Sequence, residues 1–98
     1  MEIKTKSGFK CKVNENKVKD WRYVNTLAKI SKTTNEIDII EYMDFLFRFL
    51  LGDEQTEKLI EHVSKKSGVA EVKDLVNEFK EITGFVSDQV KKSTSSQV

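Results

Sequence analysis

The residues of this chain that could do chemistry are few and far apart. Its 98 residues include one cysteine, Cys11, and one histidine, His62. A thiol and an imidazole can form a nucleophile–base pair, but such a pair also needs a third group that orients the imidazole. Nothing in the sequence positions that group. We therefore interpret His62, which lies beside Val63 in a charged segment, as a surface or half-buried imidazole.

Three carboxylates, Asp38, Glu41 and Asp44, are three residues apart and share one stripe of a helix. A metal site built from such a stripe would also need histidine or a facing acidic helix, and the sequence indicates neither. We interpret the three as a solvated stripe. The chain has no H-E-x-x-H, C-x-x-C or glycine-rich phosphate motif. We expect no enzymatic activity, no cofactor and no metal.

The carboxylate stripe belongs to an unusually apolar segment, residues 37–51, with eleven apolar residues in fifteen. Arg48 completes the polar stripe, and the rest of the helix circumference is apolar, which is more than a surface helix needs. Fifteen residues span roughly 22 Å, short of the ~30 Å core of a bilayer. We therefore expect a helix that is wrapped by its neighbours or partly offered to another protein.

The remaining patterns predict a mainly α fold with a short N-terminal β-hairpin and a compact bundle of about four helices. Alternating residues around Ser7-Gly8 predict the hairpin, and the pair Thr33–Glu36 predicts a capping box for the central helix. Gly52 and Gly68 follow apolar segments where helices end. The expected elements are a hairpin at about 2–13, helices at about 18–31, 35–51, 54–67 and 70–91, one domain over 1–92, and a disordered tail at 93–98.

Two helical faces follow from spacing. The first helix is expected to bury Trp21, as a core anchor, in a face formed by Val18, Trp21, Val24, Leu27 and Ala28. The last helix carries a Val/Phe stripe: Val72, Val76, Phe79, Val86 and Val90. Gly84 interrupts this stripe, so we expect a helix to about Thr83 and a weaker continuation to Lys91.

Composition narrows the function class further. The net charge of +1 comes from intermixed acids and bases, so no global field attracts nucleic acid or an anionic membrane. A single cysteine excludes an intrachain disulfide and fits a reducing compartment. The N-terminal EIKTKSGFKCK lacks the apolar segment of a signal peptide, and we expect a cytoplasmic protein.

Several segments together resemble the small tail assembly chaperones of siphovirus-type phages and prophages of Gram-positive bacteria. They are KSGFKCKVNE at 6–15, the dipeptide Asp20-Trp21, LLGDEQTEKLIEHV at 50–63, Gly68, and KDLVNEFKEI at 73–82. The likeness covers roughly residues 6–82 as an order and spacing of features, and LLGDEQ is its strongest piece.

The resemblance implies a non-enzymatic protein of the host cytoplasm that is absent from the mature virion. Such chaperones bind the long, helical, aggregation-prone tape measure protein and help to recruit tail tube protein around it. Many are also made in a longer form by ribosomal frameshifting. The family supplies no catalytic or binding residues to transfer.

A chaperone for a helical client needs apolar surface in an otherwise charged protein. The candidate partner-binding residues are Tyr42, Phe45 and Phe49 of the central helix and Val86 and Val90 of the last. These residues either form the domain's own core, bind a client, or make a homo-oligomer. The alternatives in function are a small helical nucleic-acid-binding regulator, using the basic first helix, and a plain oligomerisation module.

Overall fold

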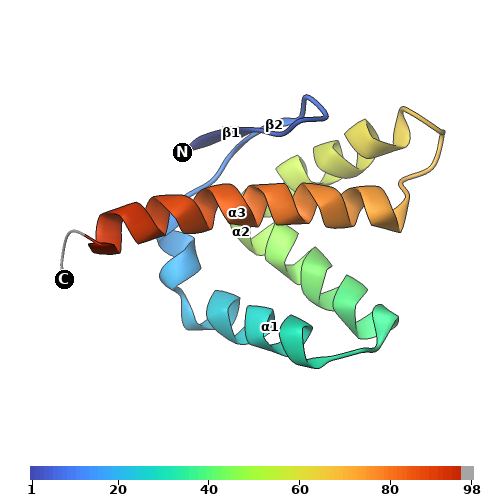
Figure 1. Cartoon of the computed structure of the whole chain (residues 1–98). Coiled ribbons are helices and arrows are strands. Elements are labelled where there is room, and N and C mark those ends of the chain that lie inside the picture. Colours follow the sequence, from blue (N-terminus) through green and yellow to red (C-terminus); the bar gives the residue numbers. More distant parts are fainter. Residues whose placement is uncertain (96–98) are drawn as a thin grey trace.

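A computed structural model describes residues 1–95 of the chain, with the side chains of residues 1–88. The described chain is mainly helical, with a two-stranded antiparallel sheet at its N-terminal end (Figure 1). Strands β1 (Glu2–Lys4) and β2 (Lys10–Lys12) pair with Ile3 opposite Cys11. The expected hairpin is confirmed. Its apolar face is buried against the helices, and its lysines point to solvent.

The segment after the hairpin differs from expectation. A short 3-10 helix, η1 (Glu15–Lys19), is capped by Asn14, and α1 (Trp21–Lys32) begins separately, capped by the Asp20 carboxylate. Because the chain is extended at Asp20, the helical phase restarts there, and a periodicity counted from Val18 does not carry through. The expected inner face is therefore wrong for most of α1. Its buried residues are Tyr23 and Thr26, whereas Trp21 is 79% exposed.

The central apolar segment lies in α2 (Glu36–Ser64). Its N-cap is Asn35, whose side chain accepts hydrogen bonds from the backbone N–H groups of Ile37 and Asp38. Thr33 instead ends α1, so the predicted Thr33–Glu36 capping box is wrong. The side chain of Asn35 reaches the first free N–H groups directly, which leaves no cap position for Thr33.

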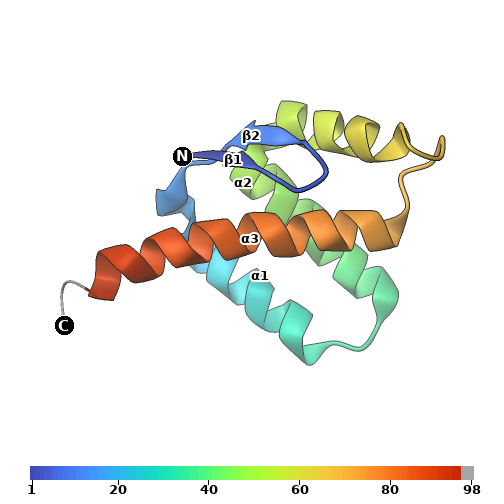
Figure 2. The ribbon, with the colours of Figure 1, turned by 45° about the horizontal axis from the view of Figure 1, so that its top comes forward.

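Helix α2 contains a sharp break at Gly52. This glycine has φ 82° and ψ 163°, and the two halves of α2 run in different directions (Figures 1 and 2). Carbonyl groups beside the break accept hydrogen bonds from side chains: Phe49 O from Lys17 Nζ, Leu51 O from Gln55 Nε2, and Gly52 O from Thr56 Oγ1. The two helices expected at 35–51 and 54–67 therefore appear as the halves of one broken helix, and residues 1–95 contain three α-helices rather than about four.

Helix α3 (Val72–Ser95) continues through Gly84 without interruption and passes the expected end at 91. Its C-terminal turns project beyond the other helices in both views (Figures 1 and 2). The tail expected at 93–98 therefore begins inside α3, and residues 96–98 lie outside the described part. Helix α2 is the hub, because it contacts η1, α1, β2 and α3. The core joins apolar residues of all these elements.

The opposite roles of two glycines give a matched stability test. Gly52→Ala places a side chain in a backbone region open almost only to glycine, so we expect the free energy of unfolding to fall by about 1–3 kcal/mol. Gly84→Ala adds a methyl group in open space within a helix, and we expect a gain of about 0.5–1 kcal/mol. Urea denaturation measures both. Equal effects of the two substitutions would contradict the break at Gly52.

Candidate functional sites

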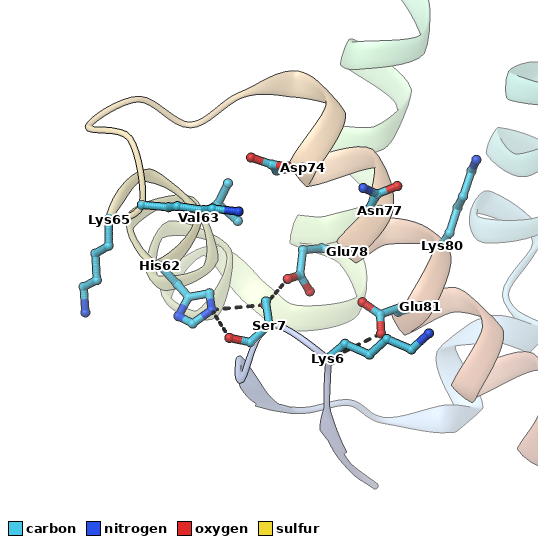
Figure 3. Close-up of a pocket in the computed structure, with 11 residues that line it drawn as sticks. Lys6, Ser7, His62, Val63, Lys65, Asp74, Asn77, Glu78, Lys80 and Glu81 are labelled. Atoms are coloured by element: carbon cyan, nitrogen blue, oxygen red, sulfur yellow. Dashed lines mark hydrogen bonds between the residues drawn. The ribbon is translucent and has the colours of Figure 1, made fainter.

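A polar cluster surrounds the tip of the hairpin where it meets α2 and α3. An open cavity of about 740 Å³ lies there, lined by Ser7, by His62 of α2 and by Glu78 and Glu81 of α3 among others (Figure 3). Ser7 Oγ donates a hydrogen bond to Glu78 Oε1. The backbone N–H of Lys6 donates to Glu81 Oε1 at 3.1 Å. We call this arrangement of Lys6, Ser7, His62, Glu78 and Glu81 the hairpin clasp.

Hydrogen-bond directions in the clasp exclude a serine–histidine nucleophile in this geometry. His62 Nε2 lies 3.2 Å from the Ser7 carbonyl oxygen and 3.1 Å from Ser7 Oγ. A carbonyl oxygen only accepts, so Nε2 carries the proton and is the donor. An imidazole activates a serine by accepting its proton at an unprotonated nitrogen. Here the serine proton goes to Glu78 instead, and the cluster fastens the hairpin to the helices.

Glu78 is the residue of the hairpin clasp whose burial destabilises the fold. It is only 4% exposed, and its second carboxylate oxygen, Oε2, is buried without a hydrogen-bond partner among the described residues. A buried carboxylate with half of its acceptor capacity unused is destabilising relative to an apolar residue of similar size. Within residues 1–88, the hydrogen bond from Ser7 is therefore the one hydrogen bond that offsets the burial of the Glu78 carboxylate.

Cys11 and His62 do not form the dyad that their chemistry would allow. The Cys11 side chain is 5% exposed on the inner face of the hairpin, whereas the His62 imidazole bonds to Ser7 and packs at 5.6 Å, centroid to centroid, from the Phe9 ring. Burial, with a smaller effect of the Glu78 charge, raises the pKa of the Cys11 thiol to about 11. The thiol is protonated at neutral pH, and a protonated thiol is a poor nucleophile.

The carboxylate stripe of α2 is partly engaged by Arg48. Its guanidinium contacts Asp44 at 3.0 Å on the same half of α2, and Asp53 at 3.2 Å and Glu57 at 2.9 Å beyond the break. Hydrogen bonds to Asp44, then Glu57, then Asp53 raise the pKa of Arg48 above its usual value. Within residues 1–95, no three His, Cys, Asp or Glu side chains are grouped as a metal site. Arg48 therefore ties the two halves of α2 together.

Three of the predicted binding residues do form one surface. Tyr42, Phe45 and Phe49 lie along one side of α2, and the rings of Phe45 and Phe49 are 5.8 Å apart. Cations from the preceding elements cover two of the rings. Lys17 and Arg22 lie 5.3 and 5.2 Å from the Phe49 centroid, and Lys29 lies 5.9 Å from that of Tyr42. We call the three aromatic residues the aromatic stripe; it is half-exposed, and positive charge borders it on the side of η1 and α1.

Of the two predicted binding residues in α3, only Val86 has a described side chain. Val86 is 0% exposed because α3 turns it into the core, so its placement on an exposed stripe is wrong. The side chain of Val90 lies outside the described residues.

Sequence reasoning also missed Trp21, which the assumed continuity of the first helix placed in the core. The signal that could have found it is Asp20, a strong N-cap residue that puts Trp21 at the first helical position.

A second apolar surface lies where α3 begins. A small hollow of about 80 Å³ lies between α2 and α3. Its lining includes Ile40, Met43, Phe47 and Ile60 of α2 and Val72 and Leu75 of α3. Ile40 and Val72 are both exposed at its rim, and Ile37 is exposed one turn before Ile40. The hollow has the size of a single aliphatic side chain, so it is a subsidiary contact and not a ligand cavity.

Comparisons with known proteins do not assign this arrangement to a family. No family model, curated protein or solved structure matches the chain. Separately, no helix within the described residues is long and apolar enough to cross a membrane. The likeness to tail assembly chaperones therefore rests on the sequence segments alone.

The clasp predicts a non-additive pair of substitutions. Ser7→Ala removes the one hydrogen bond that the buried Glu78 carboxylate accepts from the described side chains, and we expect the free energy of unfolding to fall by about 1–3 kcal/mol. Adding Glu78→Leu removes the carboxylate and should recover most of that loss. Ser31→Ala, on the exposed side of α1, is the control and should change stability by less than about 0.5 kcal/mol. A double variant less stable than Ser7→Ala would contradict the clasp.

Cys11 predicts a loss of stability at alkaline pH. Its pKa in the folded protein, about 11, is above the ordinary value of 9.0, so above pH 9 the unfolded chain releases the thiol proton first. The contribution of the raised Cys11 pKa to the free energy of unfolding is complete below pH 9 and is lost as pH rises toward 11. Unfolding at a series of pH values should show wild type losing up to about 2–3 kcal/mol relative to Cys11→Val over this interval. Parallel curves for the two proteins would refute the assignment.

Proposed function

We propose that this protein is a non-enzymatic binding protein that holds amphipathic helical segments of a larger client, and that its role is that of a phage tail assembly chaperone. The client would be the tape measure protein, with tail tube protein recruited around it. The sequence resemblance supplies the identity of the client. The exposed apolar residues supply the physical reason for binding.

The observation that carries the proposal is where the exposed large apolar side chains lie. Of the eight such side chains within residues 1–88, five fall between residues 21 and 45, on α1 and the first half of α2: Trp21, Val24, Ile37, Ile40 and Phe45. Single exposed apolar residues are common, but neighbouring ones with an aromatic stripe are typical of interaction surfaces. Helices α1 and α2 pack against each other, and Arg22 of α1 lies over the Phe49 ring, so Trp21 and Val24 lie near the aromatic stripe, whereas Ile40 lies at the hollow beside α3.

The described arrangement favours protein binding over catalysis. The hairpin clasp uses its serine and histidine to fasten the hairpin, and the thiol is buried and protonated. The α2 surface instead offers rigid aromatic side chains on a well-packed helix, which is how helix-in-groove contacts are built. The same surface would serve a homo-oligomer, so the test must contain a second protein.

Co-expression with the long, helix-rich protein encoded beside this chain tests the proposal. We expect the client to move from the insoluble to the soluble fraction and to co-purify with this protein. An unrelated coiled-coil protein of similar length is the control and should gain no solubility. If the neighbouring protein is equally insoluble with and without this chain, and does not co-purify, the proposed function fails.

Phe45→Asp tests the surface itself. Phe45 is 36% exposed, so a charge is tolerated there but placed in the middle of the aromatic stripe. We expect client recovery in the soluble fraction to fall at least tenfold while the circular dichroism spectrum is unchanged. Phe85→Asp, at an exposed phenylalanine of α3, is the matched control and should bind normally. Equal loss with both variants would place the binding surface elsewhere.

A further inference from the structure

Trp21 is exposed in a way that tryptophan rarely is. The side chain is 79% exposed at the first position of α1, and Val24, one turn later, is 50% exposed. Ala28 follows at the next turn and is also exposed. The spacing i, i+3, i+7 aligns the three on one side of α1, away from the buried Tyr23 and Thr26. We call Trp21, Val24 and Ala28 the outer face of α1.

Positive charge is concentrated around this face. Residues 15–32 contain five lysine and arginine residues against two acids, a net charge of +3, although the whole chain has only +1. Asp20 engages Arg22 at 2.9 Å, and the pKa of Asp20 falls to about 2 chiefly through that side-chain hydrogen bond. Helix α1 itself contains no aspartate or glutamate. Lys29 and Lys32 therefore add unopposed charge along the helix.

The outer face of α1 and the positive charge around it adjoin the aromatic stripe of α2. Arg22 and Lys29 extend from α1 over the rings of Phe49 and Tyr42, so the cationic border lies between the outer face of α1 and the stripe. The result is a surface with a tryptophan at one end, aliphatic residues along α1, and a row of cations between these and the aromatic residues. Its complement is an apolar stripe flanked by acidic residues.

We propose that the outer face of α1, with the adjoining aromatic stripe, binds an acidic amphipathic helix of the client. This inference rests on the proposed function and specifies the chemistry of the segment that is held. Trp21 is the anchor, because tryptophan gives large contact area at a small cost in conformational entropy. Lys29 and Lys32 select acidic flanks and speed association.

Two other anionic partners fit the surface less well. Nucleic-acid stacking platforms use several open ring faces, but cations already cover the rings of Phe49 and Tyr42, which leaves only Trp21 and Phe45 open on this surface. An interfacial membrane helix would present a continuous apolar face to lipid, whereas the outer face of α1 is narrow and the opposite side of the helix is buried in the protein. The three apolar residues of the outer face form one narrow stripe along α1. A stripe of this width fits the apolar side of another helix.

Fluorescence of Trp21, the only tryptophan of the chain, gives a direct readout. The probe is a synthetic amphipathic peptide of about 20 residues with leucines along one stripe, glutamates flanking it and alanine elsewhere. We expect its addition to shift Trp21 emission to shorter wavelength, with at least tenfold tighter binding than the same peptide carrying lysine for each glutamate. Equal affinity for the two peptides, or tighter binding of oligo(dT) or anionic vesicles, would overturn the proposal.

Matched variants separate the anchor from the charge, with a fluorescent label on the peptide as readout. Trp21→Ala should weaken binding at least tenfold, whereas Val69→Ala, at another highly exposed apolar residue, should bind within twofold of wild type. Lys29→Glu with Lys32→Glu should weaken binding at least fivefold, and Lys65→Glu with Lys66→Glu, which keeps the same total charge change, should not. Indistinguishable results within either pair would refute the assigned surface.

The outcomes distinguish this inference from the proposed function. If co-expression rescues the client but the glutamate peptide does not bind, the chaperone role stands and the acidic-helix specificity is wrong. If the peptide binds at Trp21 but the client is neither solubilised nor co-purified, the binding specificity stands and the chaperone role is wrong.

Discussion

The break at Gly52 is the constraint on which the rest of the molecule depends. Only glycine readily adopts its backbone conformation, and the turn it makes folds the second half of α2 back toward the hairpin and α3. The turn is stable because backbone carbonyl groups and carboxylates on both sides of Gly52 have hydrogen-bond donors. Lys17 and Thr56 bond the carbonyl groups beside it, and Arg48 joins carboxylates from the two halves. A straight helix of the same sequence would leave its apolar circumference uncovered.

This turn also explains which surfaces remain open. Helices α1 and α3 both pack against α2, and Ile40 and Phe47 of its first half lie beside Ile60 of its second half and Leu75 of α3. Cations of η1 and α1 reach over the rings of the aromatic stripe. The apolar residues of 37–51 therefore have two roles: Leu46 and its buried neighbours form the core, and the half-exposed aromatic stripe is the surface that we propose binds a partner.

Sequence reasoning recovered what depends on local chemistry and composition. The hairpin, the helical character and the interruption at Gly52 all follow from patterns of residues that are close together in the sequence. The errors arose where two local signals competed. Asn35 capped α2 in place of Thr33, and the cap at Asp20 reset the phase that would have buried Trp21. The hairpin clasp could not be predicted from the sequence, because no local pattern relates Ser7 to Glu78, which is 71 residues later.

The clasp also sets the order in which this molecule can be completed during synthesis. The hairpin leaves the ribosome first, but Glu81, which binds the Lys6 backbone, is 75 residues further along the chain. At about 5–20 residues per second, that separation is a delay of about 4–15 s. Until α3 emerges, the apolar underside of the hairpin, with Ile3, Phe9 and Cys11, has only part of its cover. The nascent chain thus passes through an interval in which its own first strands need protection.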